Sequence, residues 1–394
     1  MTELKYWLWL SLALYQNSHK MTSLLEKFDT PLDIYNADKD DFRQIENITI
    51  KNIERLCDKR LIFAEQVMDE CRKKGIRIMT FDSEYYPKLL ANIFDPPYVL
   101  YVKSRNRIDL NNELTVAVVG TRTMSDYGRD TALKIGSDLA SAGVTVVSGM
   151  ARGIDGAALS GALSAGGKTV AVLGCGVDIA YPPEHGAMMQ KIAETGMVIS
   201  EYPPGSPPLP NHFPVRNRII SGLSSGTVVV ESAETGGSLI TASQALEQGR
   251  DVFAVPGMVT ELKSDGTNEL IRQGAHLVSS ALDIISEYQS EYVNIFEKAM
   301  QTEQVRTQTE PAIVKKVVSK IPAPELPSVD NNLYKELPDN EKRIIDCISL
   351  TPTHVDTLAE KTNLSASELN SALTLLEMKG LIKQIAGRHF ILKI

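Results

Sequence analysis

The chain has 394 residues, of which 43% are hydrophobic and 23% charged, and its formal net charge at pH 7 is -8. A chain of this length is too long for one ordinary hydrophobic core, so we expect two or three domains. The acidic balance excludes a protein that attracts nucleic acid through an overall basic field. Any binding of that kind must come from a local patch.

The four cysteines, Cys57, Cys71, Cys175 and Cys347, are scattered and form no C-x-x-C pair. This spacing fits reduced thiols and neither a disulfide framework nor a zinc site. The apolar run Trp7–Tyr15 is too short to span a bilayer, and we interpret it as a packed amphipathic helix. We therefore expect a cytoplasmic protein that does not enter a membrane.

Residues 1–75 predict an N-terminal all-helical domain, because apolar residues recur at helical spacing in Leu4–Tyr15, Met21–Phe28 and Leu61–Cys71. Two probable strands follow, at 77–80 and 98–102. For this helical part, a packing role is favoured over contact with DNA or with another protein.

From Leu114 to about Ile285 short β-branched runs alternate with helical segments of ten to fifteen residues. This alternation predicts an α/β fold with a doubly wound, mostly parallel sheet, in a core domain over residues 76–290. The predicted strands are Thr115–Val119, Thr145–Ser148, Thr169–Leu173, Val198–Glu201, Thr227–Glu231, Asp251–Val255 and a short one near His276–Val278.

Residues 291–336 are rich in proline and polar residues and predict a linker. Residues 337–394 return to an ordered pattern of three helices and a β-hairpin, which predicts a winged-helix domain. Its third helix opens with a capping box at Ser365 and Glu368. The two hairpin strands after it, Leu381–Ile385 and His389–Leu392, are joined by the turn Ala386–Arg388. That helix is nearly uncharged, so protein contact or packing is favoured over the reading of a DNA sequence.

The candidate site lies at the carboxyl ends of the predicted strands, where such sheets bind their ligands. Glycine-rich turns stand at these ends: Gly120-Thr121-Arg122, Gly149–Gly153, Gly174-Cys175-Gly176 and Pro256-Gly257, with Glu231 ending another strand. Glycines such as Gly149 and Gly153 let a backbone approach a ligand closely. Gly236, Gly237 and Ser238 open a further helix, whose amides would attract a phosphate, with Ser238 as its cap.

The first turn does not fit a dinucleotide fingerprint, because Arg122 stands where the second glycine is needed. An arginine beside free amides suits an external phosphodiester. The alternative is a structural ion pair with a carboxylate such as Asp155, whose own predicted role is to cap the helix near Gly156.

Phe213, Asn217 and two arginines lie just upstream of the Gly236 turn and add an aromatic face suited to single strands. Arg216 and Arg218 are two positions apart and would point about 200° away from each other on a helix. One of them would line the groove, and the other would pair with a buried carboxylate such as Glu201 or Glu231. The sequence leaves open which one.

No catalytic constellation, metal-ligand spacing or cofactor motif is visible around this site. His185, His212 and His276 have no carboxylate or cysteine at metal-ligand spacing. We therefore expect neither an enzyme nor a bound cofactor.

A series of motifs resembles one known family, the DNA-processing protein A family, also called Smf. The motifs are Gly120-Thr121-Arg122, Ser148–Asp155, Ala171–Gly174 with Tyr181-Pro182, Ser200-Glu201-Tyr202, Phe213–Arg218 and Gly237–Ala242. The resemblance is strong over residues 76–285 and looser outside them.

The resemblance implies an extended Rossmann-like core that binds single-stranded DNA without cutting it. Such proteins protect incoming strands during natural transformation and help to load the RecA recombinase. The family forms dimers through the late part of the core, here around Asn268, Ile271 and Leu277.

Carried over by motif, Gly120, Thr121 and Arg122 would hold a phosphate and Phe213 would stack on a base. Asn217, Gly237 and Ser238 would line the groove. One departure concerns the position after the Tyr-Pro pair, where some members place a lysine and this chain has Pro183 and Glu184.

Two other classes of function stay open. One is a nucleoside-monophosphate phosphoribohydrolase, although its P-G-G-x-G-T-x-x-E motif is absent and Glu231 precedes Gly236-Gly237. The other is an adaptor that binds only protein partners.

Overall fold

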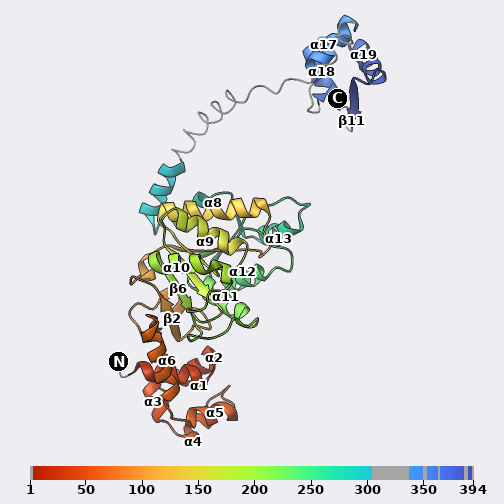
Figure 1. Cartoon of the computed structure of the whole chain (residues 1–394). Coiled ribbons are helices and arrows are strands. Elements are labelled where there is room, and N and C mark those ends of the chain that lie inside the picture. Colours follow the sequence, from red (N-terminus) through yellow and green to blue (C-terminus); the bar gives the residue numbers. More distant parts are fainter. Residues whose placement is uncertain (1–2, 304–336, 349–352, 363, 386–388, 393–394) are drawn as a thin grey trace. The chain divides into compact units, whose positions relative to one another are not determined.

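The computed structural model describes residues 3–303, 337–348, 353–362, 364–385 and 389–392 (Figure 1). The chain divides into two compact units, Met1–Arg306 and Thr307–Ile394. The predicted boundary between residues 75 and 76 falls inside the first unit and stays a prediction. Residues 304–336 of the predicted linker and the turn Ala386–Arg388 lie outside the described residues.

The first unit begins with short helices, as the apolar spacing predicts. Several end and restart at capping boxes, in which a Thr or Asp side chain and the side chain three residues later satisfy the free amides of a helix start. Trp7 is buried and stacks on Tyr98 of the core, with ring centroids 5.9 Å apart. The helices are α1 (Leu4–Ala13), α2 (Ser18–Leu25), α3 (Pro31–Asn36), α4 (Lys39–Arg43), α5 (Ile50–Cys57) and α6 (Ile62–Lys73).

The core of the first unit is one twisted sheet in the order β1-β2-β6-β5-β4-β3-β7-β8-β9 within the described residues. The pairs from β6 to β9 are parallel, whereas β1 and β2 add an antiparallel edge. The mostly parallel sheet is thereby confirmed. Its strands are β1 (Arg77–Thr80), β2 (Val99–Lys103), β3 (Thr115–Val119), β4 (Thr145–Ser148), β5 (Thr169–Leu173), β6 (Met197–Ser200), β7 (Gly226–Val229), β8 (Asp251–Ala254) and β9 (His276–Leu277).

Helices cover both faces of this sheet because alternate side chains of each strand point to opposite faces. Val116 and Val118 of β3 belong to one buried cluster, and Ala117 and Val119 belong to the other. The first cluster includes side chains of α8, α9 and α10, and the second includes those of α11 and α12. The core helices are α7 (Lys88–Ala91), α8 (Asp126–Ala142), α9 (Ile154–Ser164), α10 (Gly186–Thr195), α11 (His212–Gly222), α12 (Gly237–Glu247), α13 (Asp265–Arg272) and α14 (Ala281–Ser286), with short 3-10 turns η1 (Leu110–Asn112), η2 (Pro183–His185) and η3 (Leu262–Ser264).

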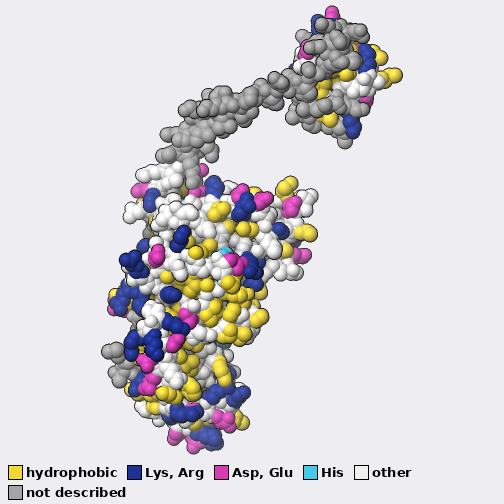
Figure 2. Space-filling model, viewed as in Figure 1, with side chains coloured by type: hydrophobic (Ala, Val, Ile, Leu, Met, Phe, Trp, Pro, Cys, Tyr) yellow, Lys and Arg dark blue, Asp and Glu magenta, His cyan; other side chains and the backbone are white. Residues whose placement is uncertain are grey.

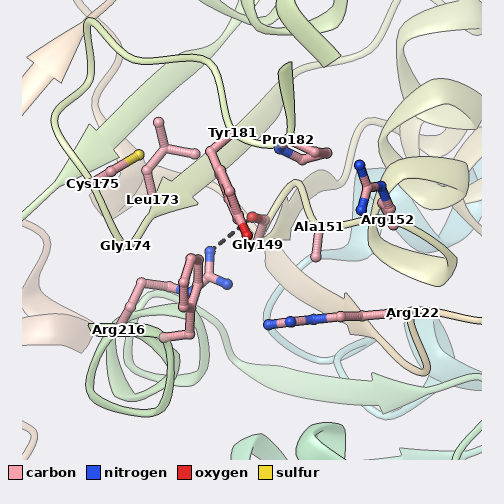
Figure 3. Close-up of a pocket in the computed structure, with 11 residues that line it drawn as sticks. Arg122, Gly149, Ala151, Arg152, Leu173, Gly174, Cys175, Tyr181, Pro182 and Arg216 are labelled. Atoms are coloured by element: carbon pink, nitrogen blue, oxygen red, sulfur yellow. Dashed lines mark hydrogen bonds between the residues drawn. The ribbon is translucent and has the colours of Figure 1, made fainter. Parts of the chain in front are cut away.

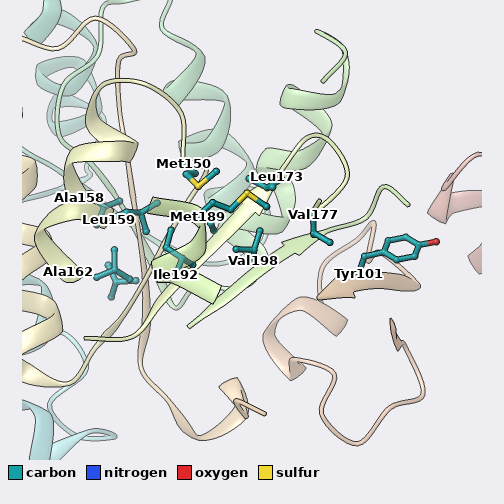
Figure 4. Close-up of a cluster of buried hydrophobic side chains, with 14 of the residues drawn as sticks. Tyr101, Met150, Ala158, Leu159, Ala162, Leu173, Val177, Met189, Ile192 and Val198 are labelled. Atoms are coloured by element: carbon teal, nitrogen blue, oxygen red, sulfur yellow. The ribbon is translucent and has the colours of Figure 1, made fainter. Parts of the chain in front are cut away.

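Figure 4 shows how the first cluster fixes α9 and α10 against the sheet. Leu159 of α9 and Ile192 of α10 are fully buried, as is Val198 of β6. Each such leucine or isoleucine contributes about 1.5–3 kcal/mol by leaving water. This packing holds the loops at the carboxyl ends of β4 and β5 in place.

The sheet reverses its winding between β3 and β7. The chain lays β4, β5 and β6 on one side of β3, then crosses back to lay β7, β8 and β9 on the other side. Ligands of open α/β sheets bind in the crevice at such a reversal, outside the carboxyl ends of the strands. The topology therefore places a binding crevice at the ends of β3 and β7.

The predicted start of the linker at residue 291 is wrong. Residues 293–303 are helical, and Tyr292, Ile295, Phe296 and Ala299 pack against the first hydrophobic cluster. Their helical spacing buries one apolar face, which outweighs the polar character of the segment.

The second unit has the helices and hairpin strands of the predicted winged helix, together with a two-residue strand that the sequence did not indicate. The capping box of Ser365 and Glu368 at the start of α19 is confirmed. Its elements are α17 (Asp339–Cys347), β10 (Thr353–His354), α18 (Val355–Thr362), α19 (Ala366–Met378), β11 (Ile382–Ile385) and β12 (His389–Leu392), with strand order β10-β12-β11.

Candidate nucleic-acid interface

The crevice at the ends of β3 and β7 is a groove with a volume of about 520 Å³. An adjoining cavity shares Arg122, Ala151, Tyr181, Phe213 and Arg216 with it (Figure 3). The groove brings together most of the residues that the sequence predicted for the site: Gly120, Thr121, Arg122, Phe213, Arg216, Asn217, Gly236, Gly237 and Ser238. Gly149 lines the adjoining cavity, whereas Gly153 and Arg218 line neither space.

The turn after β3 offers fewer free amides than the sequence suggested. Thr121 donates its backbone N–H to the carbonyl of Glu231, at 2.7 Å. Ser125, at the start of α8, donates its N–H to the Glu231 carboxylate, at 2.8 Å. A Cβ at Gly128 would collide with that carboxylate. The anion position at the start of α8 is therefore filled by a protein side chain, and the turn offers a ligand chiefly the Arg122 guanidinium.

Arg122 is exposed and forms no ion pair with a described residue. Its guanidinium carbon lies 5.4 Å from the centroid of the Phe213 ring. Tyr181 approaches the same ring, with centroids 5.3 Å apart. In Figure 3 the side chains of Arg122 and Tyr181 both point toward the middle of the cavity. A cation and two aromatic rings thus meet at one place.

Arg216 forms the floor of the site and not its rim. It is 3% exposed, and it donates hydrogen bonds to the carbonyls of Gly149, at 2.8 Å, and of Val172. Burial lowers its pKa to about 10, against the opposing charge of Asp155. The guanidinium stays charged at pH 7 and sits 5.9 Å from the Phe213 centroid. Its positive charge therefore reaches the groove from below.

Arg218 does not belong to the interface, which corrects its assignment to nucleic-acid binding. The side chain is 6% exposed and bonds Asp95, at 2.9 Å, and Glu201, at 2.8 Å. The two arginines point apart on α11, as their spacing predicts, and the predicted pairing with Glu201 is confirmed for Arg218. Arg216 lines the groove, as predicted for one of the two arginines, although its side chain is buried.

Gly149 and Gly153 are explained by packing and not by the close approach of a ligand. Gly149 donates its N–H to Asp155, at 3.0 Å, and a Cβ there would meet the Arg216 guanidinium at 2.6 Å. Gly153 has a φ of +79°, and a Cβ there would collide with the Thr121 carbonyl. Asp155 binds the Gly149 loop from inside α9, so it does not cap that helix, and it forms no ion pair with Arg122.

The start of α12 is open to the groove. Gly236 is its N-cap residue, no side chain caps it, and a Cβ added at Gly237 would meet nothing within 4 Å. The amides of Gly237 and Ser238 bond no described residue. Ser238 is not the predicted cap, because its hydroxyl lies 2.9 Å from that of Ser232 and is buried. The helix start therefore presents unsatisfied N–H groups, which attract anions.

Other residues of the groove were not assigned from the sequence. Tyr181 is 37% exposed and lines both spaces, although its motif was quoted only for the resemblance. One apolar wall comes from Pro208, Pro210, Pro214 and Ile240. The dense prolines upstream of Phe213 were the available signal for this wall.

Glu184, which follows the Tyr181-Pro182-Pro183 segment, changes the charge at the edge of the site. Glu184 accepts a hydrogen bond from Arg152 Nε, at 2.5 Å, and both side chains are exposed. This bond lowers the pKa of Glu184. This ion pair neutralises Arg152, so among the described residues that line the groove Arg122 is the exposed cation.

The residues expected at a dimer interface lie at the far end of the sheet. Leu277, on the edge strand β9, is 56% exposed. Ile271 is half-buried on α13. The Asn268 side chain is used within the chain, where it donates to the carbonyl of Gly257, at 3.1 Å, and accepts from its N–H, at 3.2 Å.

None of the described helices is both long and apolar enough to cross a membrane. No group of three or more His, Cys, Asp or Glu side chains in the described parts of the chain is placed to hold a metal ion.

Comparison with known proteins places this chain in a family. A family model described as DNA recombination-mediator protein A matches residues 77–289, and a DprA winged helix domain model matches residues 330–388. Protein Smf of Synechocystis is 33% identical over 357 residues, 88% of each chain. DNA processing protein DprA of Streptococcus pneumoniae is 45% identical over 204 residues, 52% of this chain and 71% of that one.

A solved structure agrees with these sequence matches. The X-ray structure of DNA processing protein A from Streptococcus pneumoniae has a TM-score of 0.63 and 34% identity, and it covers 72% of this chain and 97% of that chain. The resemblance inferred from the motifs is confirmed: the chain belongs to the DNA recombination-mediator protein A family, also known as DprA or Smf.

Proposed function

We propose that this chain binds single-stranded DNA along the groove at the carboxyl ends of β3 and β7. The observation that carries the proposal is the meeting of Arg122, the Phe213 ring and the uncapped start of α12 in one groove. A phosphate is held by a helix start and by a guanidinium, and a base stacks on an aromatic ring.

The phosphates and the bases would take different walls of the groove. Arg122 and the amides of Gly237 and Ser238 suit the phosphates, with the buried Arg216 adding positive charge below. Phe213 and Tyr181 suit the bases, and the prolines beside them offer apolar surface without side-chain hydrogen-bonding groups. Stacking of this kind accepts any base, so we propose binding without strong sequence preference.

We propose that the chain binds DNA without cutting it. Among the described residues that line the groove, Asp155 is the one acidic residue, and it is buried and bonded to Gly149. Glu231 is also engaged, by Ser125. A general acid or base must reach the reacting group, and neither carboxylate is free to do so. This argues against the phosphoribohydrolase alternative.

The biological role follows from the family. We propose that the chain acts in the cytoplasm on DNA taken up in natural transformation and on strands entering recombination. There it would protect single strands and help to load the RecA recombinase. The name of a relative, DNA processing protein, and the family description, recombination-mediator protein, support the part in DNA processing and recombination.

We further propose a homodimer formed through α13 and β9. An edge strand leaves unpaired backbone groups, and the exposed Leu277 adds apolar surface that a second copy would cover. Leu277→Asp should convert the dimer to a monomer on a sizing column with light scattering. A wild-type chain that elutes as a monomer at all concentrations would contradict this part of the proposal.

We propose that the winged helix contacts protein. The exposed face of α19 carries Leu375 and Met378, 47% and 80% exposed, beside Glu368 and Glu377. Acidic groups on such a helix repel a DNA backbone, and the apolar side chains suit a protein surface.

The test of DNA binding is a titration with oligo-dT at several salt concentrations. Arg122→Ala should lower the affinity and reduce the slope of log K against log salt by about 0.7, the loss of one phosphate contact on a single strand. Arg122→Lys should keep most of the slope. Arg43→Ala removes an exposed charge far from the groove in the sequence and serves as the control. Unchanged binding by Arg122→Ala would contradict the proposal that DNA binds in this groove. Release of free base from AMP would favour the phosphoribohydrolase alternative.

A further inference from the structure

A set of basic side chains lies at the opposite edge of the sheet from the groove. Strand β2 runs antiparallel to β6, and Lys103 at its end pairs with Val198 near the amino end of β6. Arg77 begins β1 and pairs with Val102. These residues therefore mark the amino ends of the parallel strands, whereas the groove opens at the carboxyl ends.

The loop after β2 brings two more arginines to this edge. Arg105 donates its backbone N–H to the carbonyl of Ala193 in α10, at 2.6 Å. Arg77 donates to the carbonyl of Asn106, at 2.7 Å, and the Arg107 guanidinium carbon lies 4.9 Å from the Tyr85 ring centroid. We call Arg77, Tyr85, Lys103, Arg105 and Arg107 the amino-edge patch.

The charges of the patch are not neutralised by described residues, and two of its arginines are exposed while Arg77, Tyr85 and Lys103 are half-buried. Arg105 and Arg107 are exposed, and Figure 2 shows Lys and Arg side chains gathered over the side of the unit that carries α10 and β2 in Figure 1. None of the four basic side chains of the patch forms an ion pair with a described residue. The acidic residues near them in the chain include Asp82, Glu84, Asp109 and Glu194. Asp82 accepts a hydrogen bond from Trp7, and Asp109 accepts hydrogen bonds from Asn111 and Asn112.

The basic side chains of the patch also repel one another. Partial burial and the charge of Arg107 lower the pKa of Arg77. Elsewhere on the unit, exposed arginines such as Arg43, Arg60 and Arg72 are each paired with an aspartate. A cluster of like charges left unpaired in a chain of net charge -8 indicates a surface that meets a polyanion.

We propose that the amino-edge patch is a second binding surface for a single-stranded nucleic acid, separate from the groove. Its guanidinium groups would contact phosphates, and Tyr85 with Arg107 would offer a plane on which a base stacks. The Tyr85 ring favours a nucleic-acid strand as the ligand, because an acidic protein segment would need only the positive charges and no aromatic ring. The proposal rests in part on the proposed function, because a strand held in the groove would continue to this edge.

A double variant, Arg105→Ala with Arg107→Ala, tests the patch. With an oligo-dT of about 30 nucleotides, the affinity should fall about tenfold and the salt slope by about 1.4, or two contacts of about 0.7 each. With an oligomer of roughly 6 nucleotides, within the size of one site, the affinity should stay unchanged because the groove alone is filled. Arg43→Ala with Arg60→Ala removes the same charge elsewhere and should leave both affinities unchanged.

Arg122→Ala separates this proposal from the groove. In that background the remaining binding of the long oligomer should disappear on adding the two patch substitutions. If the patch variant binds the long oligomer as the charge-matched control does, the second surface is overturned and the groove stands. If the patch variant alone loses binding and Arg122→Ala has no effect, the groove is overturned instead. Circular dichroism and thermal unfolding verify that each variant is folded.

Discussion

The Arg122 guanidinium carbon lies 5.4 Å from the Phe213 ring centroid, and the two residues come from different elements. Arg122 belongs to the turn after β3, and Phe213 lies in the first turn of α11. The winding reversal of the sheet brings these elements to one crevice. A group for phosphates and a group for bases therefore meet at the place where the fold binds ligands.

Replacement of Phe213 should weaken DNA binding without changing its dependence on salt. Phe213→Ala removes the stacking plane, which contributes about 1–3 kcal/mol per base, so the affinity should fall roughly 5- to 150-fold. Phe213→Tyr keeps a ring and should bind nearly as wild type does. Titration with oligo-dT at several salt concentrations measures both quantities. A reduced salt slope in Phe213→Ala would mean that the residue acts on phosphate contacts instead.

Replacement of Arg218 should damage stability and leave the interface intact. Arg218→Met leaves the buried Glu201 carboxylate without its cationic partner and takes one partner from the half-buried Asp95. Loss of one partner of a buried ion pair typically costs about 3–5 kcal/mol. Urea unfolding measures the loss, with the exposed pair of Arg43 and Asp40 as control through Arg43→Met. If Arg218→Met is as stable as wild type but binds DNA weakly, the original assignment of Arg218 to the site is right.

Loss of the Glu231 charge should loosen the start of α8. The carboxylate is 4% exposed and accepts a hydrogen bond from the N–H of Ser125. Its negative charge is also stabilised by the positive end of the helix dipole at the start of α8. Glu231→Gln keeps the shape and an acceptor but not the charge, so the free energy of unfolding should fall by about 1–2 kcal/mol. Denaturant unfolding at pH 7 checks this. A catalytic Glu231 would instead leave stability unchanged and alter a reaction.

The buried cysteines should resist alkylation at pH 8. Burial raises the pKa of the Cys175 thiol to about 11 and that of Cys71 to about 12. At pH 8 the thiolate fraction of Cys175 is then about one in a thousand, and only the thiolate reacts. Iodoacetamide followed by mass spectrometry should label the exposed Cys57 first and leave Cys71 and Cys175 unmodified until the chain is unfolded. Cys175 lines the adjoining cavity, so its rapid labelling in the native chain would show that this cavity opens.

The strands were predictable because their signal is local. Runs such as Thr115–Val119 and Thr169–Leu173 are β-branched and buried on both faces, as in any internal parallel strand. The convergence of the Gly120 and Gly236 turns followed from the same pattern, since the ends of parallel strands share one edge.

The details of the site depend on contacts between distant segments, which no local pattern encodes. The sequence did not indicate that Glu231 fills the start of α8, or that Gly149 and Gly153 are needed to pack Arg216 and Thr121. It separated the two arginines of α11 correctly by helical geometry but could not indicate that both are buried. Burial depends on the packing of α11 between β5 and α12, which is a tertiary property.

The most direct measurement is photocrosslinking of a short 4-thiothymidine oligomer, followed by trypsin and mass spectrometry. The account predicts crosslinks in the peptides 169–191 and 192–216, which carry Tyr181 and Phe213. Both crosslinks should weaken in Arg122→Ala. Crosslinks confined to the winged helix or to the N-terminal helices, with none in these two peptides, would contradict the claim that the groove holds the strand.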